Sequence, residues 1–218
     1  MNILEIIKGW DTQLFLLING IHSPFFDNFM FQVSNKLVWI PFYIAILYTL
    51  IKYRKKEAFW IALALILCIV ISDQVASGVL KNSVKRLRPS HVDSLSSVIH
   101  LVKGYGGGGL YGFASSHASN SVGFALLSAL IIRKRVYTIS IFAWAAITAY
   151  SRIYLGAHYP LDVVAGAFIG MIAAVFCYAL IIIQYRPQAL SGREIDESVP
   201  TAILLLSFLG IIIYSFVA

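Results

Sequence analysis

The sequence predicts an all-α integral membrane protein: a polytopic bundle of about six transmembrane helices preceded by an interfacial N-terminal helix. Of the 218 residues, 59% are hydrophobic and only 12% are charged, and the mean hydropathy is +0.81. A soluble domain carries about 25% charged residues, and a chain of this length cannot hide so many apolar side chains in one core. The apolar residues also gather into runs close to the ~20 residues that cross a bilayer.

The chain begins with an apolar segment that is interrupted by polar residues. Within residues 3–20 these are Glu5, Lys8, Asp11 and Asn19. Such a pattern favours an amphipathic helix lying at the membrane interface over a helix that spans the bilayer. We expect Ser23 and Pro24 to end this helix, and a second polar-punctuated piece to follow before the first span.

Six apolar runs follow, at about residues 36–52, 58–80, 118–132, 136–155, 160–184 and 200–217. Pro41 is expected to kink the first, because proline removes a helical hydrogen bond. A polar segment over residues 81–117 contains Gly106 to Gly109, which predicts either a flexible lid or a linker. A linker with Pro187 and Gly192 precedes the last run.

We expect a single membrane-embedded domain over residues 1–218, with a catalytic core at about 58–184 and an extra C-terminal span at about 200–217. The formal charge of +7 predicts contact with anionic head groups or substrates. Nucleic acid is not an expected partner, because the basic residues flank apolar spans instead of forming one soluble face. No obligate protein partner is inferred.

Lysine and arginine predict the orientation of the spans. The links between spans one and two, three and four, and five and six all carry basic residues, and alternation places these links on one side, which should be cytoplasmic. The polar segment and the turn at His158 then face the other side. A short chain of spans is typical of a bacterial protein, so we expect the inner (plasma) membrane, with the site facing the periplasm or exterior.

Residues 151–162 place three charged or titratable side chains in an otherwise apolar segment, and such residues in a membrane protein are functional candidates. Pro160 suits the first turn of a helix, so His158 would precede that helix within reach of Asp162. A carboxylate beside one imidazole nitrogen leaves the other nitrogen free to attack. Arg152 supplies a charged fork suited to phosphate oxygens. The segment therefore indicates a histidine nucleophile aimed at phosphorus.

Two further groups are expected on the same side. Lys81 and Arg88 are seven residues apart, so they would share one face of a helix that Pro89 ends. Ser115 and Ser116 suit a helix N-cap, whose free N–H groups and dipole attract anions. His117 could there protonate a departing oxygen.

These segments resemble the three signature motifs of the type 2 phosphatidic acid phosphatase family, which are Lys-x6-Arg-Pro, Pro-Ser-Gly-His and Ser-Arg-x5-His-x3-Asp. The first appears as Lys81 followed by Arg88-Pro89, and the third as Ser151-Arg152, His158 and Asp162. The second departs, because Ala114 and Ser116 replace the family proline and glycine. Three motifs in order are specific, whereas any one alone is weak.

The resemblance implies a lipid phosphatase that needs neither metal nor cofactor. His158 would form a phosphohistidine, Asp162 would orient it, and His117 would act as general acid and then base. The phosphate would be held by Lys81, Arg88, Ser115, Ser116 and Arg152. Its substrate would be a lipid phosphate monoester or diphosphate, with undecaprenyl pyrophosphate or lipid A preferred over phosphatidylglycerol phosphate and phosphatidic acid.

Other readings are open from the residues. A lipid phosphotransferase could use the same scaffold, and a non-enzymatic lipid-binding or transport protein could keep the fold. His158 and Asp162 could form a structural hydrogen bond or two ligands of a metal site, and Lys81 and Arg88 could merely extend to the membrane interface. A transporter, however, should show repeats and polar residues near the bilayer midplane, where this chain has them at one end.

Overall fold

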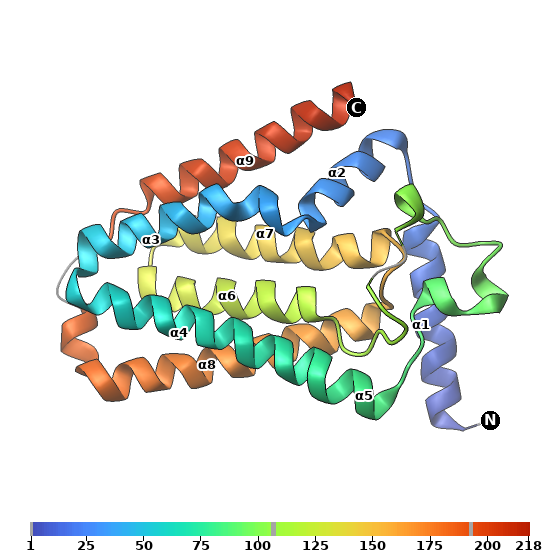
Figure 1. Ribbon diagram of the computed structural model, residues 1–218, viewed down its shortest axis with the longest axis horizontal. Helices are drawn as coiled ribbons and strands as arrows, with labels where there is room; N and C mark the ends of the chain where they lie inside the picture. Colours follow the sequence, from blue (N-terminus) through green and yellow to red (C-terminus); the bar gives the residue numbers. More distant parts are fainter. Residues whose placement is uncertain (1, 106–107, 192–193) are drawn as a thin grey trace.

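The computed structural model describes residues 2–105, 108–191 and 194–218, with no side chains for 185–191. Across this part of the chain the regular secondary structure is helical, joined by turns and loops, and an isolated bridge pairs Leu87 with Tyr111. The main helices are α3 (Ile40–Arg54), α4 (Lys56–Asp73), α6 (Ser116–Ile132), α7 (Arg135–Tyr154), α8 (Pro160–Ser191) and α9 (Ser198–Val217). They run along the long axis of the molecule (Figure 1).

The predicted spans all appear as helices, with boundaries that differ by a few residues. Four described segments are long and apolar enough to cross a membrane, namely Lys36–Arg54, Lys56–Val84, Pro160–Gln184 and Ser198–Val217. Helix α6 is a shorter apolar helix, and α7 lies beside it with an arginine near each end. The all-helical membrane bundle predicted from hydropathy is confirmed.

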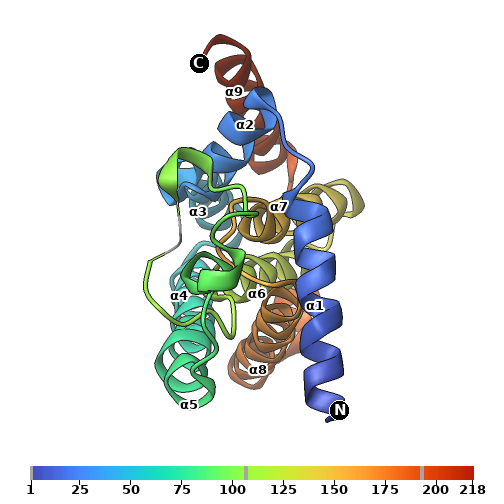
Figure 2. The same cartoon turned by 90° about the vertical axis from the view of Figure 1, so that its right-hand side faces the viewer.

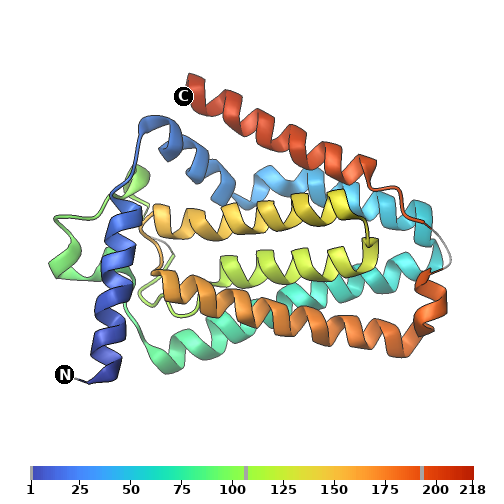
Figure 3. The same ribbon diagram turned by 180° about the vertical axis from the view of Figure 1, so that it is seen from behind.

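Helix α6 occupies the middle of the bundle. Seen end-on, it lies among α4, α7 and α8, while α9 packs on the outside against α3 and α2 (Figure 2). The links α3–α4, α6–α7 and α8–α9 lie together at one end, as the basic residues predicted (Figure 3). At the other end, helix α1 (Ile3–Asn19) crosses the ends of α7 and α8 instead of running parallel to them (Figures 1 and 3).

Short elements complete the end of the bundle where α1 lies. Helix α2 (Pro24–Ser34) and the 3-10 turn Lys36–Trp39 lead into α3. A π-helical stretch (Gln74–Leu80) and α5 (Lys81–Val84) extend α4, and 3-10 turns follow at Pro89–His91, Asp93–Leu95 and Val102–Gly104. Helix α5 and the 3-10 turns after it lie at the end of the bundle where α7 leads into α8, and this end therefore holds the candidate segments (Figure 1).

Three local predictions were wrong. Pro41 lies in the first turn of α3, where its missing N–H is tolerated, and a 3-10 turn precedes it in place of a kink. Lys81 and Arg88 do not share a helix, because Lys85 adopts φ +51° and ends α5, which leaves Arg88 extended. Helix α8 runs on to Ser191 through the expected linker; Gly192, like Gly106 and Gly107, lies outside the described residues.

Helices α6 and α8 pack with their backbones almost touching, through small residues. A Cβ at Gly166 would lie 2.3 Å from the Ser115 carbonyl oxygen, and one at Gly170 would lie 2.2 Å from that of Ser119. Gly-x-x-x-Gly spacing puts both glycines on one face of α8, which permits this close approach in membranes. The contact runs from Ser119 to Ser115, where the candidate site begins.

We expect Gly170→Ala to destabilise the protein by about 1–3 kcal/mol, because the methyl group would force α6 and α8 apart. The measurement is thermal unfolding in detergent, followed by tryptophan fluorescence. The matched control is Gly210→Ala in α9, where a Cβ would meet nothing within 4 Å. Equal unfolding temperatures for the two variants would contradict the packing argument.

Candidate active site

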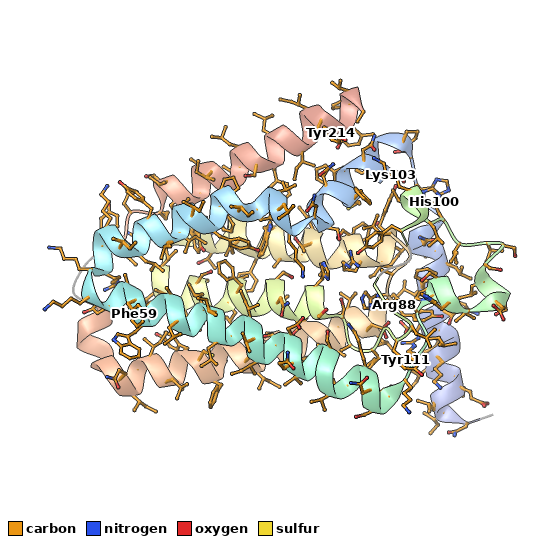
Figure 4. All side chains as sticks on the ribbon, viewed as in Figure 1. Phe59, Arg88, His100, Lys103, Tyr111 and Tyr214 are labelled. Carbon is orange, nitrogen blue, oxygen red and sulfur yellow. The ribbon has the colours of Figure 1, made fainter. Side chains whose placement is uncertain are left out.

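Two distant segments pair beside the turn between α7 and α8. Leu87 and Tyr111 form the antiparallel bridge, the Arg88 N–H donates to the Leu110 carbonyl at 3.1 Å, and the Gly112 N–H donates to the Arg86 carbonyl at 2.8 Å. Figure 4 shows Arg88 and Tyr111 at this end of the bundle. The pairing holds Arg88 against the chain that enters α6.

His158 lies in this turn and is only 1% exposed. Its Nε2 is 2.9 Å from Nη1 of Arg88, which also donates to the Ala157 carbonyl at 2.9 Å, while the Arg88 Nε donates to the Gly109 carbonyl at 2.7 Å. A guanidinium only donates hydrogen bonds, so Nε2 accepts and the proton of the neutral ring belongs on Nδ1. The lone pair of Nε2 therefore points at a cation that suits phosphate.

Asp162 is fully buried one turn beyond His158, with its Oδ2 3.6 Å from His158 Nδ1. That separation is within ion-pair range but longer than a hydrogen bond. Oδ2 accepts from the Tyr159 N–H at 3.1 Å and Oδ1 from Arg86 at 2.9 Å. The two residues are brought together as the spacing predicted, yet other donors hold the carboxylate.

Arg152, 1% exposed, reaches the site from the last turn of α7. Its guanidinium donates to the Ser34 hydroxyl and, at 2.8 Å, to the Tyr105 hydroxyl, and its carbon lies 5.0 Å from the centre of the Tyr105 ring. Its Nε is buried without a hydrogen-bond partner among the described residues. Ser34 and Tyr105 were missed, because both lie outside the three motifs.

Helix α6 points its N-terminus at the same place. The Ser115 hydroxyl caps it by accepting from the Ala118 N–H at 3.5 Å, and the Ser115 N–H donates to the Asp162 carbonyl at 2.9 Å. Ser116 and His117 form the first turn and line a cavity. The unsatisfied N–H groups and the dipole of a helix N-terminus attract anions.

Lys81 lies at the start of α5 and donates a hydrogen bond to the Ser77 hydroxyl at 3.0 Å. Together with Arg88 and Arg152 it lies close enough to act on His158. Burial, and after it the charges of these three cations, hold the pKa of His158 well below its ordinary value, which is about 6.5. The imidazole is therefore neutral at neutral pH, as a nucleophile requires.

Gly112 completes the wall behind the imidazole. A Cβ at this position would lie 3.0 Å from Oδ2 of Asp162, 3.3 Å from Cγ of Arg88 and 3.6 Å from Nδ1 of His158. The site thus has no free space on that side. The sequence signal is a single glycine three residues before Ser115, which is too weak to find alone.

An apolar cavity of about 420 Å³ adjoins the cationic cluster. Its polar lining includes Ser34, Lys36, Ser116, His117 and Asn120. Its apolar lining comes mainly from α3, α4, α6 and α7, including Leu47, Ile66, Phe124 and Trp144, with Trp39 from the 3-10 turn before α3. Leu47 and Ile66 are also exposed on the outside of the bundle, so the cavity reaches the surface that faces lipid.

The chain is similar in sequence to proteins of known family. The model of the PAP2 superfamily matches residues 57–186. The chain is 40% identical to a lipid A 4'-phosphatase of Bacteroides thetaiotaomicron, over 98% of this chain and 99% of the relative. It is 38% identical to a lipid A 4'-phosphatase of Porphyromonas gingivalis, over 80% of this chain and 74% of the relative.

A solved structure has the same fold. The crystal structure of Aquifex aeolicus LpxE aligns with a TM-score of 0.60 at 26% identity, covering 77% of this chain and 94% of that one. The chain therefore belongs to the PAP2 superfamily. It is an integral membrane hydrolase of phosphate esters.

We expect the His158 ring to be neutral and protonated on Nδ1 at neutral pH, because burial and the neighbouring cations hold its pKa well below the ordinary value. The measurement is ¹⁵N NMR of histidine-labelled protein in detergent, without substrate, with a His158→Asn sample to assign the signal. A titration midpoint at or above about 6.5 would contradict the charge environment described.

Gly112→Ala should lower kcat/KM by about 10-fold or more, because the methyl group would push Asp162 and Arg88 from their positions, and displacements near 1 Å can cost 100-fold. Phosphate release from the preferred lipid is the measurement. Gly108→Ala is the matched control, since a Cβ there meets nothing within 4 Å. Full activity in Gly112→Ala would show that this wall is not needed.

Proposed function

We propose that this protein removes a phosphate from a lipid A-type glycolipid through a phosphohistidine on His158. The observation that carries the proposal is the 2.9 Å approach of Arg88 to the His158 Nε2 lone pair, in a buried pocket next to an apolar cavity. A phosphate placed there would meet the nucleophile and its counter-charges together. Positioning and charge neutralisation supply most of the catalysis in phosphoryl transfer.

In the first step, Arg88 releases Nε2 and donates to a phosphate oxygen instead. The Nε2 lone pair then attacks phosphorus, the P–N bond forms and the bond from phosphorus to the lipid oxygen breaks. His117, in the first turn of α6, gives that oxygen its proton. The negative charge of the bound phosphate favours the protonated imidazole needed for this. In the second step His117 takes a proton from water, the oxygen attacks phosphorus, and the P–N bond breaks to release inorganic phosphate and restore His158.

The non-bridging oxygens would be held by Arg88, Arg152 and Lys81, with Ser115 and Ser116 offering the N-terminus of α6. Arg152 now donates hydrogen bonds to the hydroxyls of Ser34 and Tyr105. A bound phosphate would accept these hydrogen bonds from Arg152 in their place. Ser116 still presents its backbone N–H although the family glycine is missing. Asp162 would stabilise the Nδ1 proton of His158 as positive charge develops.

The apolar cavity would take a hydrocarbon chain of the substrate. A volume of about 420 Å³ lies within the range of small-molecule sites, and its polar end begins at His117. A lipid seated with its chain between α3 and α4 would present its head group to the cations. Lys36 lines the cavity near His117, where it would pair with a second negatively charged group of the lipid head group.

The choice of lipid A rests on the two relatives named lipid A 4'-phosphatase, one of which matches this chain over nearly its whole length. Undecaprenyl pyrophosphate, phosphatidylglycerol phosphate and phosphatidic acid share the phosphate but differ in the rest of the head group. We further propose that the site faces the periplasm of a bacterial inner membrane, opposite the basic links.

The test is phosphate release by purified protein in detergent with EDTA, against lipid A, undecaprenyl pyrophosphate, phosphatidylglycerol phosphate and phosphatidic acid. We expect lipid A to lose its 4'-phosphate fastest. His158→Ala should abolish turnover, and Asp162→Asn should lose less, since the nucleophile remains. Strong activity in His158→Ala would overturn the phosphohistidine, and release from another lipid only would overturn the substrate.

The fate of the phosphoryl group separates hydrolysis from transfer. With ³²P-labelled lipid A and a mixture of unlabelled lipids, we expect the label in inorganic phosphate. Label in a second lipid would replace the hydrolase by a phosphotransferase. Arg152→Lys, which keeps the charge but loses the planar fork, should raise KM and lower kcat, and unchanged kinetics would exclude the clamp.

A further inference from the structure

Asp11 of α1 reaches the active site although it lies far outside the three motifs. It is 4% exposed. Its Oδ1 accepts a hydrogen bond from the Leu161 N–H at 2.9 Å, in the first turn of α8, and its Oδ2 lies 2.7 Å from Nη2 of Arg86. One carboxylate therefore fixes α1 to the start of the helix that carries Asp162.

Arg86 is shared between two buried carboxylates. Its Nη2 pairs with Asp11, its Nη1 donates to Oδ1 of Asp162 at 2.9 Å, and its guanidinium stacks 3.9 Å from the centre of the Tyr159 ring. A planar guanidinium presents a separate Nη group to each acid in a fixed geometry, whereas a lysine offers a single nitrogen on a flexible stem. The acids and the arginine thus form a chain that ends 3.6 Å from Nδ1 of His158.

The end of that chain is incompletely bonded. Nδ1 of His158 is buried and makes no hydrogen bond of standard geometry to Asp162 or to any other described residue, although the imidazole interacts with the backbone of Gly112. Asp162 is instead held by Arg86 and the Tyr159 N–H. The position of Arg86, together with the Tyr159 N–H, therefore sets how far the Asp162 carboxylate stands from the imidazole. Asp11 in turn decides the position of Arg86.

We propose that Asp11 is a positioning residue for the His158–Asp162 pair and acts through Arg86, which makes α1 part of the active site. This inference rests on the proposed function of His158. Of the two carboxylates that pair with Arg86, only Asp162 remains charged when the charge of Asp11 is removed. The arginine then draws the Asp162 carboxylate away from Nδ1. The imidazole then loses the anion that holds its tautomer and orientation.

Helix α1 has one buried face and one exposed apolar face, which fits this role. On the faces turned away from the bundle it exposes large apolar side chains, including Ile3, Leu4, Ile7, Trp10, Leu14 and Leu17. Its buried residues are Asp11, Phe15 and Asn19. An amphipathic helix of this kind lies in the membrane interface. Through Arg86 and Asp162, Asp11 therefore connects His158 to a helix that contacts lipid.

The experiment compares Asp11→Asn with Glu5→Gln, which removes an exposed charge from the same helix. An asparagine oxygen can still accept from the Leu161 N–H, so only the ion pair is lost. We expect kcat on the preferred lipid to fall about 10-fold, with KM within about 2-fold, because support of a reacting group is lost and substrate binding is not. Glu5→Gln should match the unaltered protein.

A second readout does not require any substrate. In ¹⁵N NMR, Asp11→Asn should broaden or shift the His158 Nδ1–H signal, while Glu5→Gln leaves it unchanged. If no lipid is hydrolysed by the unaltered protein, the proposed function fails but this readout still tests the positioning. An unchanged His158 signal together with unchanged kcat in Asp11→Asn would overturn the inference.

Arg86 provides the independent check on the chain. Arg86→Lys keeps the positive charge but replaces the two fixed Nη groups that face Asp11 and Asp162 by one nitrogen on a flexible stem. It should therefore show the same loss of kcat and the same change of signal, with Lys85→Gln as its exposed neighbouring control. The double variant Asp11→Asn/Arg86→Lys should be no worse than Arg86→Lys alone, since both act on one element. Additive losses would overturn the proposed route, even if Asp11→Asn alone folds poorly.

Discussion

The close contact between α6 and α8 is the constraint on which the rest of the site depends. Because Gly166 and Gly170 have no side chains, the two backbones meet at Ser115 and Ser119. At that contact the Ser115 N–H reaches the Asp162 carbonyl. This contact fixes the N-terminus of α6, which attracts anions, to the first turn of α8, which carries Asp162. Helix packing, and not a loop, sets their relative position.

The bundle and the composition of the site were predictable from sequence for different reasons. Hydropathy marks spans because lipid contact demands apolar side chains all along a helix, and motif spacing marks His158, Asp162 and Arg88. The partners of these residues were not predictable. Asp11 and Tyr105 reach the site through tertiary packing, and the helix end at Lys85 depends on a left-handed conformation that lysine only occasionally adopts.

The arginines of the site differ in whether a carboxylate balances their charge. Arg86 is matched by Asp11 and Asp162, whereas Arg88 is bonded to backbone carbonyls and to neutral His158, and Arg152 to hydroxyls. Buried cations without anionic partners are costly. Under the proposed function, a phosphate bound between Arg88 and Arg152 would offset this cost. A pocket arranged in this way favours bound anions in proportion to their charge.

The cavity beside His117 opens toward lipid between α3 and α4, at Leu47 and Ile66. A substrate that uses this opening moves sideways within one leaflet and keeps its hydrocarbon chains out of water throughout. Encounter is then a two-dimensional search, governed by the fraction of the leaflet that the substrate occupies instead of by its concentration in solution. Turnover in a cell would follow the composition of the membrane immediately around each molecule.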